Sequence, residues 1–573
     1  MGLLVRDAGF TCADAEEELR NAIDAARYYE QSAMADGLQD GTSPEPLGVV
    51  AVAPGRTHPL ADAVAGIAAA WVMGNSIIYK PAAYNTLLGH RLTEILADAG
   101  ITDPQLQLVP CLDNEIGTKL LAAPQVDGII TSLGNNVAHH LAATRPTATL
   151  CSSPSGATTV YISSRGDWQQ AVRDIAAAAY RRSGQCPTAP HILLVHAAVY
   201  DNKHFQAALA DAISSLPAGP GNREGNILGP LSAPLAPEQL DFLTKTPESA
   251  WLVRPATTEM GSITWSPGVI TSLTPDSPEL ALLEGLPVLA LMRTETTTQA
   301  ASLQRSLSAG RAAAIYTPDA GDVSIWQRAL EGTAHLCINC CPSARPGLRP
   351  FGTHRPSLCG CGLLPGGPNF ITALANWQET ARPQRRSARR DIPFAPWETL
   401  VPKPTPEETM RLSAAADSIS YWWEKEFGSA RLICAHPGEP TELYYSPISL
   451  CLRAEKETSD SDLAIALMAA LKAGCRVQLS TATARPWMPR TLQELGVPVR
   501  VESRKEFEYR FPALASDGIV VRDPAASDAA ASVAEACGLR LSRASIVSNG
   551  RLELLQCLQE HTITRRVKSK YND

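Results

Sequence analysis

The chain has 573 residues, of which 45% are hydrophobic and 19% charged, and its formal net charge is −8. This composition is typical of a globular protein of about two to four domains and excludes a disordered chain. The negative charge argues against a nucleic-acid partner, and no apolar run reaches the about 20 residues that span a membrane. The first residues carry no signal-peptide pattern, so we expect a cytoplasmic protein whose cysteines are reduced thiols.

The first part of the chain alternates predicted helices and strands. Over residues 13–33, helical spacing predicts a buried stripe of Ala15, Leu19, Ala22, Ile23, Ala26 and Tyr29. A loop at 37–46 leads to a buried strand at 47–52, a helix at 60–73 and a strand at 76–79. The alternation continues as helix 85–99, strand 105–109, helix 115–122 and strand 127–131. This order predicts an α/β fold with a parallel, doubly wound sheet of the Rossmann type.

An internal repeat extends this prediction to the C-terminal part. Residues 46–79 and residues 447–480 both read as strand, loop, alanine-rich helix, glycine and strand. The correspondence continues further along both segments, since residues 127–130 (DGII) match residues 517–520 (DGIV). Several matching segments in the same order indicate two similar α/β units within one chain.

Five motifs follow one another along the chain in an order known from one family. They are residues 46–52 (PLGVVAV), 74–82 (GNSIIYKPA), 183–186 (SGQC), 227–230 (ILGP) and 366–369 (GGPN). In this order they resemble the aldehyde dehydrogenase superfamily, and within it the C-terminal half of proline utilization A proteins. The resemblance implies NAD-dependent oxidation of L-glutamate γ-semialdehyde, the open form of 1-pyrroline-5-carboxylate, to glutamate.

The resemblance also implies a division of the chain. Residues 1–164 correspond to a Rossmann-type cofactor-binding domain that is truncated at its N-terminus, and residues 165–370 to the catalytic-type domain. Residues 371–405 are rich in proline and arginine and are interpreted as a linker. Residues 406–573 resemble a second, smaller aldehyde-dehydrogenase-like α/β domain, which would account for the repeat.

The family's nucleophile is a cysteine in the motif Gly-Gln-x-Cys. This chain reads Gly184-Gln185-Cys186-Pro187, so the candidate Cys186 stands one position early and Pro187 takes the family position. A displaced thiol points in a different direction, and Pro187 restricts the backbone of Cys186. Two interpretations stay open, a working nucleophile and a remnant.

Two further parts of the family's machinery are not matched. Ser153 stands where the family has the glutamate that activates water, and a serine hydroxyl is a poor base near neutral pH. The segment 54–59 (PGRTHP) stands where the family has an asparagine that binds the oxyanion, and it contains no asparagine.

The resemblance assigns cofactor and substrate residues as well. Lys80 matches the lysine that holds the adenosine ribose of NAD, although the partner acidic position is Ala83. Gly134 corresponds to the glycine beside the pyrophosphate, and Glu284 to the glutamate of a ribose motif, each slightly displaced. In the family's substrate pocket the matching positions are Asn339 and Phe351.

A cysteine cluster allows another interpretation. Cys337, Cys340, Cys341, Cys359 and Cys361 lie close in sequence, and paired cysteines at such spacing can bind zinc. However, both groups fall in segments that match family motifs lining the substrate pocket. We therefore expect free thiols and no metal.

Three functions remain at this point. The first is an NAD-dependent dehydrogenase of a small semialdehyde whose key residues are degenerate. The second is a catalytically inactive aldehyde-dehydrogenase-fold protein with a structural or interaction role, and the third is a cysteine–metal protein. The family resemblance also implies a homo-oligomer that forms through a β-hairpin flap, and no membrane or nucleic-acid partner.

Overall fold

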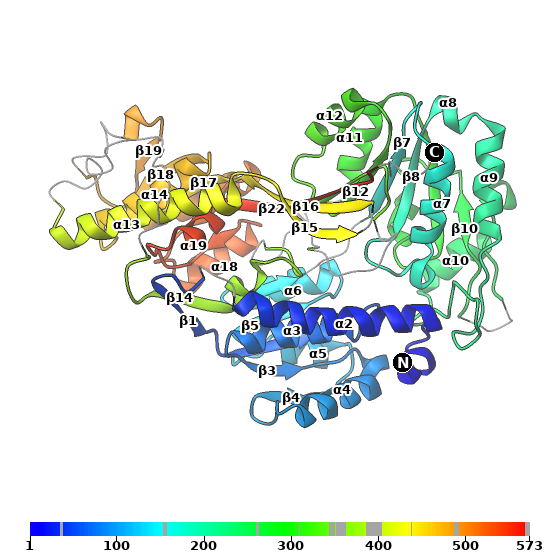
Figure 1. Cartoon of the computed structure of the whole chain (residues 1–573), viewed down its shortest axis with the longest axis horizontal. Helices are drawn as coiled ribbons and strands as arrows, with labels where there is room; N and C mark the ends of the chain where they lie inside the picture. Colours follow the sequence, from blue (N-terminus) through cyan, green and yellow to red (C-terminus); the bar gives the residue numbers. More distant parts are fainter. Residues whose placement is uncertain are drawn as a thin grey trace.

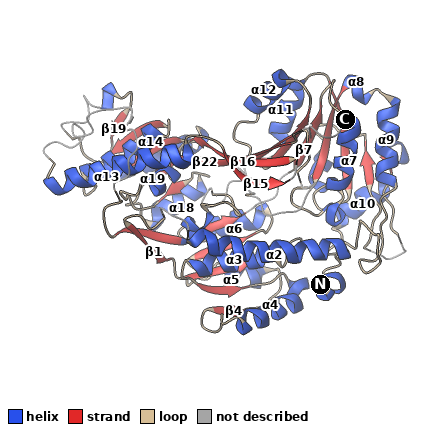
Figure 2. Ribbon diagram, viewed as in Figure 1, coloured by secondary structure: helices blue, strands red, loops and turns tan. Residues whose placement is uncertain are grey.

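The computed structural model of the chain describes residues 1–34, 38–152, 157–258, 263–308, 310–342, 350, 363–384, 404–436, 438–485 and 492–567. Within these residues the strands form a ten-stranded sheet, two five-stranded sheets and a two-stranded ribbon. Each larger sheet carries its own helices, so the protein has three α/β units (Figures 1 and 2).

The N-terminal unit is built on a parallel sheet of order β4-β3-β2-β5-β6. Its strands are β2 (Val49–Ala53), β3 (Ser76–Tyr79), β4 (Leu106–Leu108), β5 (Gly128–Thr131) and β6 (Thr149–Ser152). Its helices are α1 (Gly2–Arg6), α2 (Cys12–Ala33), α3 (Ala61–Val72), α4 (Thr86–Asp98), α5 (Glu115–Leu121) and α6 (Asn135–Thr144). The predicted doubly wound parallel sheet is therefore confirmed. Its central strand β2 is wholly apolar because helices cover both faces.

The buried face of α2 differs from the predicted one. Leu19 is 36% exposed and Ile23 45% exposed, and Ala26 is exposed as well, so the predicted stripe is wrong at these three positions. The face that packs against α3 instead carries Ala15, Glu18, Ala22, Ala25 and Tyr29. The carboxylate of Glu18 is thus buried in the interface between α2 and α3.

The segment 37–46 was predicted as a loop, but its second half is a strand. β1 (Thr42–Pro46) pairs antiparallel with β14 (Ala375–Glu379), which lies within the segment interpreted as a linker. Two prolines, Pro44 and Pro46, remove backbone donors and give the segment the appearance of a loop. They are tolerated because the ribbon has only two strands.

The ten-stranded sheet has the order β15-β16-β22-β13-β12-β7-β8-β11-β10-β9. Its central strands are parallel: β7 (Thr158–Ile162), β8 (Pro190–His196), β10 (Gly268–Ile270), β11 (Val288–Thr294), β12 (Ala312–Tyr316) and β13 (His335–Ile338). At one end lies the antiparallel β9 (Trp251–Val253). The associated helices include α7 (Trp168–Ala179), α8 (Ala197–Tyr200), α9 (Lys203–Ser214), α10 (Pro237–Lys245), α11 (Thr297–Leu307) and α12 (Ala320–Ala329).

The C-terminal unit repeats the topology of the N-terminal one. Its parallel sheet has the order β19-β18-β17-β20-β21. The strands are β17 (Ser449–Ala454), β18 (Arg476–Thr481), β19 (Val499–Val501), β20 (Val520–Arg522) and β21 (Leu541–Ser542). The helices are α13 (Pro406–Trp422), α14 (Asp460–Lys472), α16 (Arg504–Tyr509), α17 (Phe511–Ser516), α18 (Asp528–Ala536) and α19 (Gly550–Leu555). Each strand corresponds in position and order to one of β2–β6, as the sequence repeat predicted.

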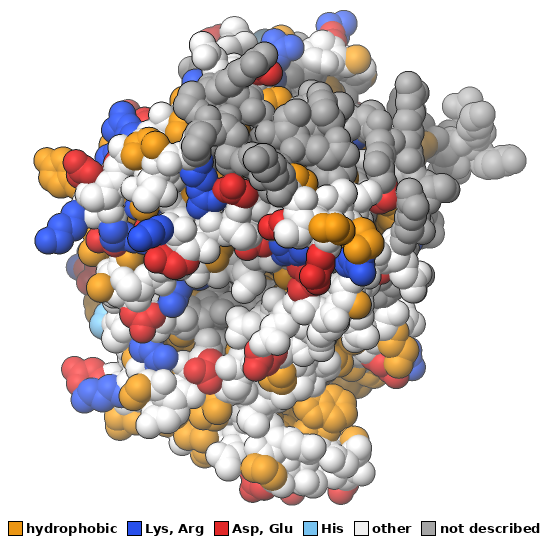
Figure 3. Space-filling model, turned by 90° about the vertical axis from the view of Figure 1, so that its left-hand side faces the viewer, with side chains coloured by type: hydrophobic (Ala, Val, Ile, Leu, Met, Phe, Trp, Pro, Cys, Tyr) orange, Lys and Arg blue, Asp and Glu red, His pale blue; other side chains and the backbone are white. Residues whose placement is uncertain are grey.

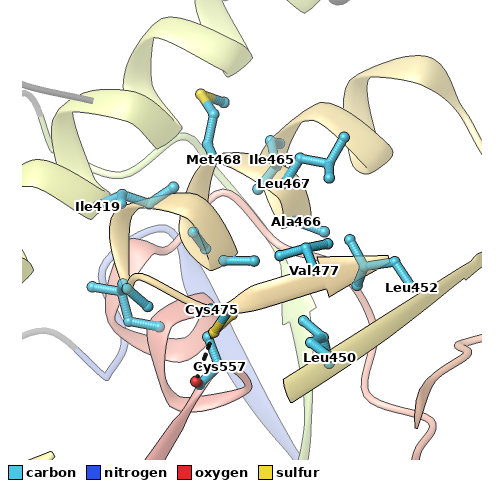
Figure 4. Packing of buried hydrophobic residues seen from close by; sticks show 14 of the residues in the cluster. Ile419, Leu450, Leu452, Ile465, Ala466, Leu467, Met468, Cys475, Val477 and Cys557 are labelled. Atoms are coloured by element: carbon cyan, nitrogen blue, oxygen red, sulfur yellow. Dashed lines mark hydrogen bonds between the residues drawn. The ribbon is translucent and has the colours of Figure 1, made fainter. Parts of the chain in front are cut away.

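The core of this unit lies between α13, α14 and the sheet. Most of α14 is buried, including Leu467 and Met468, because helices and strands surround it on several sides (Figure 4). Beside it, the thiol of Cys475 donates a hydrogen bond of 3.0 Å to the backbone carbonyl of Cys557 (Figure 4). The unit therefore has a hydrophobic core of its own.

The C-terminal unit also completes the ten-stranded sheet. β22 (Leu558–Arg565) pairs parallel with β13, and β16 (Glu439–Pro447) and β15 (Arg431–His436) continue the sheet as antiparallel strands. These strands reach from the C-terminal unit across to the large sheet (Figure 1). The domain division made from the sequence stays a prediction, and the strands show that one sheet is shared across it.

No helix in the described part of the chain is long and apolar enough to cross a membrane. One face of the surface is seen in Figure 3, where Lys and Arg side chains are interspersed with Asp and Glu side chains.

Candidate active site

A cavity of about 1340 Å³ lies between the N-terminal unit and the unit of the large sheet. The loop between β2 and α3, the segment after β5 and the loop after α7 all contribute to its wall. Its lining includes the sequence-predicted residues Cys186, Gly134 and Glu284. The fold thus brings a thiol, a helix N-terminus and a carboxylate into one space, although they are up to 150 residues apart in sequence.

A strained turn positions Cys186. After α7, the short helix η2 (Arg181–Gly184) contains three consecutive left-handed residues, Arg182 (φ 48°), Ser183 (φ 56°) and Gly184 (φ 77°). A Cβ on Gly184 would lie 2.1 Å from the carbonyl oxygen of Leu286. Non-glycine residues in this conformation cost on the order of 1–3 kcal/mol each, and such strain often accompanies functional sites. The turn places Cys186 on the cavity wall with 7% of its surface exposed.

A histidine lies next to the thiol. His58, from the segment 54–59 that lacks the family's asparagine, is hydrogen-bonded to Cys186. Its Nδ1 lies 3.1 Å from Oε2 of Glu18 and 3.0 Å from Nη1 of Arg182. Both Cys186 and His58 line the cavity, so the pair faces the space that a substrate would occupy.

Glu18 fixes this arrangement from behind. Its side chain is fully buried, and Oε1 accepts hydrogen bonds from the backbone N–H groups of Leu60 (3.0 Å) and Ala61 (2.9 Å) at the start of α3. Oε2 accepts a hydrogen bond of 2.6 Å from Nη2 of Arg182. The helix N-terminus and the guanidinium offset the cost of removing the Glu18 carboxylate from water. This explains how a charge can be buried between α2 and α3.

These contacts set the pKa values of the group. Burial raises the pKa of Cys186, but the hydrogen bond and charge of His58, followed by Arg181 and Arg182, lower it to about 5. Burial and Arg182 lower the pKa of His58, but Cys186 and Glu18 raise it to about 10. Burial also raises the pKa of Glu18, yet Arg182 and His58 hold it well below its ordinary value. Near neutral pH the pair is therefore a thiolate and an imidazolium.

The loop before α3 contains a second polar chain. The backbone N–H of Gly55 donates to Oγ of Ser132 (2.7 Å), and this hydroxyl donates to Oδ2 of Asp62 (2.7 Å). Ser132 follows β5, so the contact ties the loop to the end of the neighbouring strand. Gly134, two residues on, is the N-cap of α6, and no atom lies within 4 Å of the position of a Cβ there.

Lys80 lies behind the cavity wall with 3% of its surface exposed. Its Nζ is hydrogen-bonded to Oδ1 of Asp113, and Oδ2 of Asp113 accepts a hydrogen bond of 3.0 Å from the backbone N–H of Ala83. Asp113 lines the cavity. A carboxylate therefore stands beside Lys80 after all, supplied by the loop before α5 and not by position 83.

Glu284 is exposed on the loop that precedes β11 and lines the cavity. Arg311, which precedes β12, also lines the cavity, and its Nη1 donates a hydrogen bond of 2.7 Å to the carbonyl oxygen of Pro187. Burial lowers the pKa of Arg311 to about 10. The wall near the thiol thus carries Arg181 and Arg311, which favour an anionic ligand.

The remaining predicted residues are placed elsewhere or lie outside the described residues. Asn339 follows β13 with φ 55°, and its Oδ1 accepts a hydrogen bond of 2.8 Å from the backbone N–H of Thr317. It is not among the described residues that line the cavity. Phe351 and Ser153 lie outside the described residues, so their roles stay predictions.

The cysteine cluster is described only in part. Cys337, Cys340 and Cys341 are buried, whereas Cys359 and Cys361 lie outside the described residues. Sγ of Cys337 lies 3.3 Å from Nε2 of His335. Among the residues that the structure describes, no group of three or more His, Cys, Asp or Glu side chains is arranged to hold a metal ion.

Sequence reasoning missed three residues of the site: Glu18, His58 and Asp113. A signal for Glu18 was present, because Ala15, Glu18, Ala22 and Ala25 follow one another at helical spacing. His58 and Asp113 lie in loops, where local periodicity carries no information on side-chain contacts.

Residues 1–378 match the aldehyde dehydrogenase family, and the chain belongs to this family. It is 27% identical over 512 residues to the bifunctional protein PutA of Klebsiella aerogenes, covering 83% of this chain and 38% of that protein. It is 23% identical over 395 residues to 1-pyrroline-5-carboxylate dehydrogenase of Bacillus cytotoxicus, covering 64% of this chain and 75% of that protein. The chain thus spans well under half the length of this PutA protein.

Solved structures share the fold. Proline utilization A from Corynebacterium freiburgense superposes with a TM-score of 0.77 at 24% identity, over 99% of this chain and 55% of that one. The 1-pyrroline-5-carboxylate dehydrogenase from Thermus with bound NAD gives a TM-score of 0.58 at 20% identity, over 65% of this chain and 76% of that one. The first of these matches covers 99% of the chain, so the fold of the C-terminal unit also has a counterpart in that structure.

Proposed function

We propose that the protein oxidises a small, negatively charged semialdehyde, L-glutamate γ-semialdehyde, with NAD as the hydride acceptor. The observation that carries the proposal is the placement of Cys186, hydrogen-bonded to His58, in the same cavity as Gly134, Glu284 and Asp113. Relatives named PutA and 1-pyrroline-5-carboxylate dehydrogenase support the substrate class.

The residues of the cavity fit NAD at three places. The N-terminus of α6 at Gly134 offers backbone N–H groups to the pyrophosphate, with no side chain in the way. Asp113 can accept hydrogen bonds from the hydroxyls of the adenosine ribose beside Lys80. Glu284 can do the same for the second ribose. When bound, NAD supplies the acceptor for the hydride of the substrate carbon.

The protein's own part of the chemistry is assigned to the thiol. The thiolate of Cys186 adds to the aldehyde carbon, which gives a hemithioacetal. The side chains of Arg181 and Arg311 lie on the same wall and attract the carboxylate of the substrate. Loss of hydride leaves an acyl thioester on Cys186, which water must cleave to release the acid.

The test combines calorimetric titration of NAD with an assay of NADH formation from glutamate semialdehyde on the same sample. We expect NAD to bind, and NADH formation to vanish in Cys186→Ala while NAD binding remains. Cys151→Ser is the matched control, because Cys151 is a second buried thiol that lines the cavity.

Absence of NAD binding at millimolar concentration would contradict the proposal. Binding without turnover would favour the alternative, a catalytically inactive member of the family with a structural role. That alternative is motivated by the segment 54–59, which has no asparagine for the oxyanion and uses the N–H of Gly55 to hold Ser132.

A further inference from the structure

A histidine from a distant loop stands beside the thiol of Cys186. His58 lies in the loop before α3, is hydrogen-bonded to Cys186 and lines the same cavity. Its segment, residues 54–59, stands where the family resemblance implies an asparagine for the oxyanion, and it contains none. The ring therefore occupies a place from which a donor can reach an aldehyde bound at the thiol.

We propose that His58 is a catalytic residue of the dehydrogenase reaction, and that its ring N–H donates a hydrogen bond to the aldehyde oxygen as Cys186 adds to the carbonyl carbon. The inference deepens the proposed function and rests on it. It assigns to a histidine the stabilisation of the oxyanion, for which residues 54–59 offer no asparagine.

Glu18 holds the ring of His58 in one orientation. Nδ1 lies 3.1 Å from Oε2 of Glu18, whose side chain is fully buried. The backbone N–H groups of Leu60 and Ala61 and the guanidinium of Arg182 keep this carboxylate in place. Because Nδ1 faces the carboxylate, Nε2 is the nitrogen that serves the thiol and the substrate. The side chain of His58 is 18% exposed, so a ligand in the cavity can reach it.

The surroundings of His58 keep the ring protonated. The titratable and charged groups that face it are Glu18, Asp62, Arg182 and Cys186. Burial and Arg182 lower the pKa of His58, but Cys186 and Glu18 raise it to about 10. A cationic donor forms a shorter and stronger hydrogen bond to an oxyanion than a neutral amide does. The imidazolium is therefore a suitable donor at the point where negative charge develops.

The step conserves atoms and charge. As Sγ of Cys186 bonds to the carbonyl carbon, the electron pair of the C=O π bond moves to the oxygen, so the negative charge passes from sulfur to an oxygen bonded to the same carbon. The N–H of His58 that faced the thiolate follows the charge to this oxygen, and the proton stays on the ring. When the carbon gives its hydride to the nicotinamide, the C=O bond forms again. The aldehyde is oxidised to a thioester and the nicotinamide is reduced.

Other donors near the thiol have other partners. The backbone N–H of Gly55 donates to a serine hydroxyl after β5. Nη2 of Arg181 is paired with Glu17, and Nη1 of Arg311 donates a hydrogen bond of 2.7 Å to a backbone carbonyl. In the proposed function the two arginines attract the carboxylate of the substrate. This division leaves the ring of His58 for the aldehyde oxygen.

The experiment must separate two effects of His58, because the ring also keeps the thiol ionised. Alkylation of Cys186 by iodoacetamide, followed by peptide mass mapping, depends on the thiolate fraction and on its nucleophilicity, and it produces no oxyanion. Addition of Cys186 to 4-formylbenzoate, an anionic aldehyde, depends on the same two quantities and also produces an oxyanion. Stopped-flow absorbance of the carbonyl follows this addition without nucleotide, with the Cys186→Ala trace subtracted. The ratio of the two rates at pH 8 isolates the stabilisation of the oxyanion.

His58→Leu should lower the ratio of addition to alkylation by about 10²- to 10³-fold, the usual cost of one oxyanion donor. His58→Gln keeps an N–H near the place of Nε2 and should lose only about tenfold. The initial burst of NADH from glutamate semialdehyde should fall in the same order. Glu18 keeps three donors in both variants, and circular dichroism checks the fold of each. His90→Leu, the same exchange at a 62% exposed histidine of α4, should leave both rates unchanged.

Equal ratios in the wild-type and His58→Leu proteins would overturn the proposal, since His58 would then act only by keeping the thiol ionised. The outcome is separable from that of the proposed function. A ratio that falls in His58→Leu, in a protein that forms no NADH, keeps the oxyanion donor and loses the dehydrogenase. A burst of NADH with an unchanged ratio keeps the dehydrogenase and loses the oxyanion donor. Absence of any Cys186-dependent reaction with both aldehydes would remove both.

Discussion

Asp113 contacts both Lys80 and Ala83. These residues lie where the family resemblance implies a contact with the adenosine ribose. The carboxylate of Asp113 is bound to Lys80 and to the backbone of Ala83, and its side chain is 33% exposed toward the cavity. A carboxylate there can accept hydrogen bonds from ribose hydroxyls but repels a 2′-phosphate. We therefore predict that NAD binds more tightly than NADP.

Asp113→Asn should weaken NAD binding about 10- to 100-fold, because a charge-assisted hydrogen bond contributes about 1.5–3 kcal/mol. It should also reduce the preference for NAD over NADP. Calorimetric titration with both nucleotides measures both effects, and a thermal melt checks that buried Lys80 has not destabilised the fold. Glu115→Gln, two residues further on and 90% exposed, is the control that should change neither. Equal affinity of Asp113→Asn and wild type would show that the ribose lies elsewhere.

The same residues show what could be predicted from sequence at this scale. Cys186 was found because a motif surrounds it, although its displacement left its activity open. Glu18 could have been found, since a charged residue at helical spacing between Ala15 and Ala22 marks either a wrong stripe or a buried partner. His58 could not, because only the folded loop shows that its ring reaches Glu18 and Cys186.

At the scale of elements, the turn η2 decides where the thiol points. Gly184 has φ 77°, and a Cβ would meet the carbonyl of Leu286, which cannot move without displacing the start of β11. The turn thus holds Cys186 by packing as well as by hydrogen bonds. The strain of Arg182 and Ser183 is offset by their partners, since Arg182 binds Glu18 and Oγ of Ser183 donates to the carbonyl of Gly229.

Gly184→Ala should therefore destabilise the protein by about 2–5 kcal/mol, of which about 1–2 arises from the left-handed backbone and the rest from steric overlap. Gly332→Ala is the matched control, because Gly332 also has a positive φ (93°) but no atom lies within 4 Å of the added Cβ. It should cost about 1 kcal/mol. Urea unfolding compares the two. Similar losses in both variants would mean that Leu286 moves aside easily.

Most elements of the N-terminal unit were predictable because apolar periodicity is strong in buried βαβ units. The strands β1 and β14 are exceptions, because they form through a pairing between distant parts of the chain. β1 and β14 pair with each other although they lie about 330 residues apart in sequence, with Thr42 opposite Glu379 in the register. Such a long-range pairing leaves no local pattern, and the prolines of β1 hide it further.

At the scale of the whole molecule, the repeat predicted two similar sheets, and both are present with the same strand order. It did not predict that the C-terminal unit also supplies strands to the large sheet, because β15, β16 and β22 lie outside the two repeated five-stranded sheets and have no counterpart in the sheet of the N-terminal unit. Of these strands, β22 pairs with β13, and β16 and β15 continue the sheet beyond β22. Side chains reinforce the junction. Nδ1 of His335 contacts Oγ1 of Thr562 at 2.5 Å, and Arg566 binds both Asp174 and Glu439.

Because of this junction, we predict that the C-terminal unit is required for the stability of the large sheet. A chain ending at residue 403 lacks β15, β16 and β22, so β13 becomes an edge with unpaired backbone groups and exposes buried Cys337 and Leu336. Exposed apolar edges promote aggregation.

We expect this truncated chain to form large aggregates in size-exclusion chromatography with light scattering, whereas a chain ending at residue 567, which keeps β22, should elute like the full chain. A truncated chain that stays monodisperse and melts at the same temperature as the full chain would contradict this dependence. It would mean that β13 is stable as an edge strand and that the shared sheet contributes little to the fold around Cys186.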